Sequence, residues 1–155
     1  MELKQGAWRI YPSLTKAVQA GLDLVATSPD LSSVLWVDGA NRFDPYVILK
    51  LTQNPTVTKK ILQRVFISRP FTIHQLHRLI ETDLVEASHR QNARTVLLVA
   101  PSAMFLDENV DEEERKHVWK KIVNHIGRLH DQGLQPLVLD YENPFTQLAG
   151  EWLDG

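Results

Sequence analysis

Residues 34–45 read VLWVDGANRFDP, an apolar run that ends in an aspartate and a glycine. Such a run is typical of a buried parallel strand that brings a polar side chain to the edge of a sheet. Ligands of open α/β sheets bind at that edge, so Asp38 is a candidate active-site residue. The alternative is that the Asp38 carboxylate only caps the turn at Gly39 and Ala40.

Short apolar runs alternate with longer segments of helical periodicity along the chain. Strands are predicted at residues 7–11, 34–38, 65–69, 95–100 and 134–141, and helices at 14–27, 45–63, 72–91 and 113–131. Pro55 divides the second helix, and Gly133 ends the last one. Residues 146–155 are expected to form a short C-terminal tail. The alternation predicts a single α/β domain over residues 1–155, with about five mostly parallel strands and helices on both faces.

The composition excludes several classes of protein. The chain has 155 residues, of which 43% are hydrophobic and 23% are charged, and it contains no cysteine. Disulfides, thiolate metal sites and cysteine nucleophiles are therefore excluded. No segment approaches the roughly 20 apolar residues of a membrane span, and the N-terminal residues lack the layout of a secretory signal. We expect a cytoplasmic protein without membrane contact.

Four segments resemble, in order and spacing, the ATPase core of the RecA-type recombinase superfamily, which includes RecA, RadA and KaiC-like proteins. They are VLWVDGANRFDPYVIL (34–49), VFISRPFTIHQLHRLIETDL (65–84), TVLLVAPSAMF (95–105) and HVWKKIVNHIGRLHDQGLQPLVLDYEN (117–143). The resemblance covers roughly residues 7–146. It implies a three-layer, RecA-like core of the P-loop NTPase type.

The groups with which that family binds and hydrolyses ATP are missing. A phosphate-binding loop needs a glycine-rich turn followed by Lys and Ser/Thr, whereas the corresponding segment reads PSLTK and supplies only Ser13, Thr15 and Lys16. The catalytic glutamate of the family falls at Ala40, which cannot orient a water molecule. Its Walker B aspartate falls at Pro101, so the usual Mg²⁺ anchor is lost.

These losses predict a non-catalytic RecA-type paralog that acts as an interaction or scaffold subunit, and the resemblance suggests recombination or repair as its setting. Asp38 and Asp140, both at predicted strand ends, are interpreted as further positions of the degenerate site. We expect no cofactor and no metal. The expected partner is a protein or a second copy of the chain, with a homodimer as the simplest closed form.

Two other functions stay open. A small metal-dependent enzyme would use Asp38 and Asp140, with Glu142 nearby, if the two strand ends converge. A nucleic-acid accessory protein would use a basic helix face, although direct binding is not expected because six carboxylates lie between residues 107 and 114.

Some histidines and tryptophans carry weaker expectations. His74 and His77 are close enough on one helix to share a metal, but no carboxylate is placed as an obvious third ligand, so a pair of surface histidines is expected. Trp36 is predicted to lie in the core. Trp119 is expected to be partly exposed because its neighbours in sequence include lysines.

Overall fold

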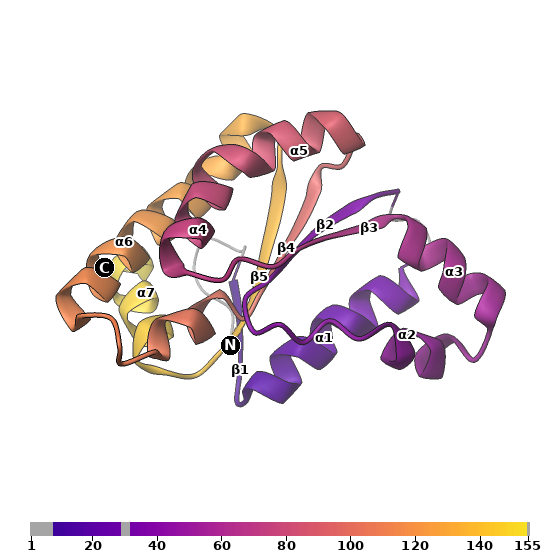
Figure 1. The fold of residues 1–155 in the computed structure, drawn as a ribbon, viewed down its shortest axis with the longest axis horizontal. Helices are drawn as coiled ribbons and strands as arrows, with labels where there is room; N and C mark the ends of the chain where they lie inside the picture. Colours follow the sequence, from indigo (N-terminus) through magenta and orange to yellow (C-terminus); the bar gives the residue numbers. More distant parts are fainter. Residues whose placement is uncertain (1–7, 29–31, 155) are drawn as a thin grey trace.

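The computed structural model describes residues 8–28 and 32–154, which form a five-stranded parallel sheet with helices on both faces (Figure 1). The strands are β1 (Trp8–Tyr11), β2 (Val34–Asp38), β3 (Val65–Ser68), β4 (Thr95–Val99) and β5 (Gln135–Tyr141). Their order in the sheet is β1-β5-β4-β2-β3, and every neighbouring pair is parallel. The predicted α/β fold is confirmed.

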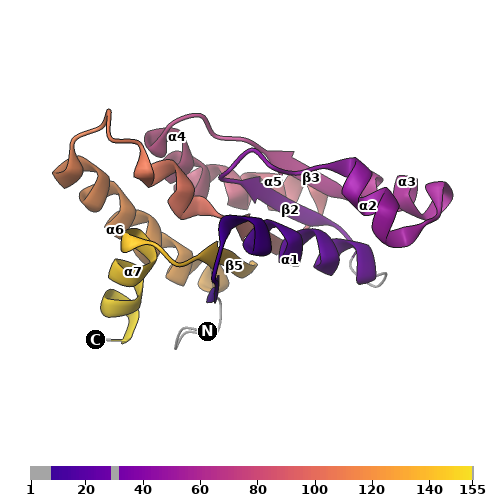
Figure 2. The ribbon, with the colours of Figure 1, turned by 90° about the horizontal axis from the view of Figure 1, so that it is seen from below.

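The helices form two layers, one on each face of the sheet (Figures 1 and 2). One layer contains α1 (Leu14–Thr27), α2 (Pro45–Thr52) and α3 (Pro55–Gln63). The other contains α4 (Ile73–Arg78), α5 (Leu84–Gln91), α6 (Glu112–Leu129) and α7 (Pro144–Asp154). A hydrophobic core lies on each face of the sheet: the first under α1, α2 and α3, and the second under the other helices. Successive strand residues point to opposite faces, so Trp36 packs into the first core and its neighbours Leu35 and Val37 pack into the second.

Most helix boundaries follow signals in the sequence. Ser13 caps α1, because its Oγ accepts a hydrogen bond from the Lys16 amide at 3.2 Å. Asn54 caps α3 in the same way and is followed by Pro55 at the first helical position, which explains the predicted break. Gly133 follows α6 and the short helix η3 (His130–Gln132), and its φ of 86° explains why glycine is used there.

Three expectations are corrected by the structure. The helix predicted over 72–91 is divided into α4, the π-helical turn η1 (Leu79–Asp83) and α5. The connection after β4, where no helix is predicted, begins with the 3₁₀ helix η2 (Pro101–Leu106), which follows a left-handed turn at Ala100 with a φ of 51°. The expected C-terminal tail is helix α7.

Trp119 also differs from the prediction, because it is fully buried. Its indole Nε1 donates a hydrogen bond to the Phe145 carbonyl at 2.7 Å, so α6 is joined to the start of α7. Trp36 is buried as predicted. None of the helices within residues 8–28 and 32–154 has both the length and the apolar character needed to cross a bilayer.

Candidate functional site

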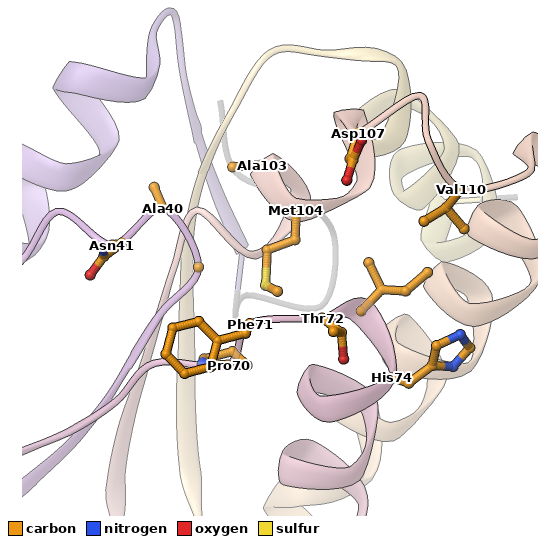
Figure 3. A pocket seen from close by; sticks show the side chains of 12 residues that line it. Ala40, Asn41, Pro70, Phe71, Thr72, His74, Ala103, Met104, Asp107 and Val110 are labelled. Atoms are coloured by element: carbon orange, nitrogen blue, oxygen red, sulfur yellow. The ribbon is translucent and has the colours of Figure 1, made fainter.

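An open pocket of about 440 Å³ lies at the carboxyl edge of the sheet (Figure 3). Segments that follow three strands line it: residues 39–41 after β2, residues 70–74 after β3, and residues between 103 and 110 after β4. The chain leaves β2 towards one helical layer and β4 towards the other. Ligands of parallel sheets bind at the point where neighbouring strands connect to helices on opposite faces of the sheet. This pocket is therefore the position at which such a fold would bind a ligand.

The lining of this pocket offers little chemistry. Among the described residues that line it, His74 and Asp107 are the titratable ones, and each already has a partner within the protein. The His74 Nε2 lies 2.8 Å from Glu114 Oε1, and the Asp107 Oδ1 accepts a hydrogen bond from the Asn109 amide at 3.0 Å. Figure 3 shows the side chains of Phe71 and Met104 among the lining groups. The lining residues within 8–28 and 32–154 thus include no acid paired with a base.

Asp38 holds the loop that follows β2. Its Oδ1 accepts a hydrogen bond from the Arg42 amide at 3.0 Å, and its Oδ2 accepts one from the Phe43 amide at 2.8 Å. The Arg69 Nε lies 3.5 Å from the same Oδ2. The side chain is fully buried. Asp38 is thus a buried cap of the turn, as the alternative interpretation of the sequence proposed.

Asp140 is also buried and also bonded within the protein. Its carboxylate accepts hydrogen bonds from the Ser102 hydroxyl at 2.7 Å, the Ser102 amide at 3.1 Å and the Tyr141 amide at 3.0 Å. Burial raises the pKa of Asp140 to about 7, although these three donors oppose the shift.

The structure does not bring Asp38 and Asp140 together. Asp38 lies in register with Val99 on β4, and Val99 lies in register with Leu139 on β5. Asp140 is one residue further along β5, so its side chain points to the opposite face of the sheet from that of Asp38. Glu142 is exposed and lies beyond the end of β5. The paired-carboxylate metal site therefore has no geometric support.

The positions that correspond to an ATP site are also spread apart. Only Pro12 and Ser13 separate β1 from α1, and Thr15 and Lys16 are exposed on the first turn of that helix. β5 and β4 lie between β1 and β2, so the strand axes are about 14 Å apart. Ala40 lines the pocket, while Pro101 is buried at the start of η2.

The ends of β2 and β4 close tightly against each other. The Gly39 amide donates a hydrogen bond to the Val99 carbonyl at 2.9 Å. A Cβ at position 39 would lie 2.4 Å from the Ala100 carbonyl oxygen, so only glycine fits.

His74 and His77, which the sequence spacing had suggested as a pair, have different partners in the structure. His74 faces Glu114, whereas His77 lies 3.0 Å from Glu81 and beside His125 on α6. The packing of α4 against α6 brings His125 to His77, and neither segment alone predicts that contact.

Comparison of the chain with models of known protein families and with curated protein sequences gives no match. The resemblance to RecA-type proteins therefore stays an expectation drawn from the residues quoted above.

Proposed function

We propose that this protein is a non-catalytic RecA-type paralog that acts as an interaction or scaffold subunit. Its binding surface lies on the β3 side of the sheet and is called here the lateral surface. One observation carries this proposal: five of the six exposed large hydrophobic side chains in the described residues belong to the segment between positions 46 and 71, which contains α2, α3 and the edge strand β3. They are Tyr46, Leu51, Val57, Ile67 and Phe71.

The lateral surface has the chemistry of a protein interface. Phe71 is 86% exposed and Tyr46 is 74% exposed, and aromatic side chains are enriched where proteins bind one another. Ile67 belongs to β3, which is an edge strand of the sheet. Leu51 and Val57 extend the surface over α2 and α3.

The carboxyl edge supports the non-catalytic part of the proposal. A connection of two residues between β1 and α1 is too short to wrap a phosphate group in backbone amides. The Asp38 and Asp140 carboxylates are both occupied by donors of the protein itself. These features support a RecA-type scaffold that lacks the groups that act on ATP.

Sedimentation velocity of the full chain over a wide concentration range tests the interaction, with self-association as the first case. We expect the average mass to rise with concentration, and the variants Phe71→Ser and Tyr46→Ser to shift this rise to higher concentration. Gln147→Ser is the control, because Gln147 is exposed on α7 at the other end of the molecule (Figures 1 and 2). A wild type that stays monomeric throughout would contradict self-association.

Nucleotide experiments test the other half of the proposal. We expect no ATP hydrolysis and no change in melting temperature on addition of Mg-ATP, since a ligand that binds only the folded state raises that temperature. Measurable turnover that survives further purification would overturn the non-catalytic assignment.

A further inference from the structure

Two histidines and a glutamate from different elements converge where α4 and η1 pack against α6. The Nε2 of His77 lies 3.0 Å from the Oε2 of Glu81, and the Nε2 of His125 lies 3.8 Å from the same oxygen. One ligand atom from each of the three residues lies within 4.8 Å of the other two. Ligands of a tetrahedral zinc site with bonds of roughly 2.0–2.1 Å are about 3.3 Å apart, so small side-chain rotations suffice.

The Nε2 of His77 is an unsatisfied buried atom. It has no hydrogen-bond partner in the described part of the chain, because its contact with Glu81 is short but not aligned as a hydrogen bond. A buried polar atom without a partner is destabilising and calls for an explanation. A bound cation at the centre of the cluster would satisfy it.

The backbone at this place is unusual as well. Glu81 lies within the π-helical turn η1, where the Leu84 amide donates to the Leu79 carbonyl five residues earlier. Such turns occur mostly as single insertions in α-helices and are frequent at functional sites. Here the turn lies between α4, which carries His77, and α5.

We propose that His77, Glu81 and His125 bind one divalent transition-metal ion, with Zn²⁺ as the ion that best fits two imidazoles and a carboxylate. The adjoining hollow has a volume of about 310 Å³ and leaves a fourth position for water or the side-chain amide of Asn124. The ion links the segment of α4 and η1 to α6. This site is independent of the lateral surface and differs from the expectation of no metal drawn from the sequence.

Two cations oppose this site, since Lys121 and Arg128 line the same hollow. Both are exposed, so water and salt screen their charges. Burial lowers the pKa of His77, and Lys121, His125 and His74 lower it further, while Glu81 acts in the opposite direction. A lowered pKa favours the neutral ring, which is the form that binds a metal.

Isothermal titration calorimetry with ZnCl₂ tests the proposal on the full chain in buffer free of chelators and phosphate. We expect one ion per chain. His77→Gln, His125→Gln and Glu81→Gln should each weaken binding by at least about tenfold, because even loss of an outer-shell partner commonly costs that much. His89→Gln is the matched control, since His89 is exposed on α5 outside the cluster. Lys121→Gln should tighten binding by removing a repulsive charge.

Circular dichroism first establishes that each variant is folded, and the partly exposed Glu81 gives the variant least able to disturb packing. Absorption of the Co²⁺-substituted protein should show the intense visible bands of a four-coordinate ion, and these should be absent in His125→Gln. Three results would each overturn the proposal: no saturable Zn²⁺ binding, Zn²⁺ binding equal in all folded variants, or binding of inorganic phosphate instead that is lost in Lys121→Gln.

Discussion

Asp140 accepts two hydrogen bonds from Ser102, one from its hydroxyl at 2.7 Å and one from its backbone amide at 3.1 Å. The pair joins the end of β5 to the chain that leaves β4. Asn143 extends the connection, because its Nδ2 donates to the Ser102 Oγ at 2.7 Å while its Oδ1 accepts from the Phe145 amide at 2.9 Å. This buried network thus attaches α7 to the sheet, and it is structural in role.

The stability of the protein should depend on the ionisation of Asp140. Its pKa is raised by burial from 3.8 to about 7 in the folded state, so folding favours the protonated carboxyl. The stability gained from the protonated carboxyl is complete below the unfolded-state pKa and is lost as the pH rises towards 7. Above pH 7 the ionisation of Asp140 no longer changes the free energy of unfolding. We expect the free energy of unfolding to fall by up to about 1.4 kcal/mol per pH unit in that window, measured by urea unfolding.

Asp140→Asn isolates this effect because an amide does not ionise. The variant should be less stable than the wild type, since one oxygen cannot serve three donors. The difference between their free energies of unfolding should narrow as the pH rises to about 7, because only the wild type loses stability over that range. The lowered pKa of His77 acts in both proteins and cancels in this comparison. A difference in stability that stays constant from acid to neutral pH would show that Asp140 has an ordinary pKa.

Gly21→Ala should destabilise the protein, although this change in a helix normally stabilises by about 1 kcal/mol. A Cβ at position 21 would lie 2.7 Å from Cη2 of Trp36, whose ring is fully buried and packs edge-on against Phe43. Because that ring cannot easily move, we expect a net loss of about 1–3 kcal/mol in chemical unfolding. Gly127→Ala is the control: Gly127 is exposed on α6, so a gain is expected there.

Asp38→Ala tests whether this residue is structural. The change removes the acceptor of the Arg42 and Phe43 amides and leaves Arg69 without its carboxylate. We expect a loss of about 2–4 kcal/mol in urea unfolding, and a smaller loss in Asp38→Asn, which retains one acceptor oxygen. Asp131→Ala, at an exposed position, should change stability little. If Asp38→Ala is as stable as the wild type, Asp38 does not act as a structural cap.

The strands could be predicted from the sequence because each is a short apolar run between clear boundaries. β2 and β4 are continuous apolar segments, as buried parallel strands require. The break between α2 and α3 follows from Asn54 and Pro55, since proline fits the first turn of a helix and disrupts its interior. These are local signals, and they were sufficient for the strands and the fold class.

The site depends on relationships that no local signal contains. Whether Asp38 and Asp140 share a face is decided by the register of three strands, and a shift of one residue reverses the answer. The meeting of His77 with His125 depends on how α4 lies against α6. Trp119 is buried despite neighbouring lysines because α7 covers it, and the sequence had not indicated that helix.

Phe145→Ala tests how far α7 contributes to the core. The Phe145 side chain is buried, its ring lies 5.6 Å from that of Phe105 and 6.3 Å from that of Trp119, and its carbonyl accepts the Trp119 indole hydrogen bond. Removing the ring leaves a cavity in the second core, so we expect a loss of about 3–5 kcal/mol in the free energy of unfolding. Gln147→Ala, on the exposed side of α7, should differ from the wild type by less than about 0.5 kcal/mol. If both variants behave alike, α7 is a peripheral segment, as the sequence had suggested for residues 146–155, and the packing of Trp119 must come from elsewhere.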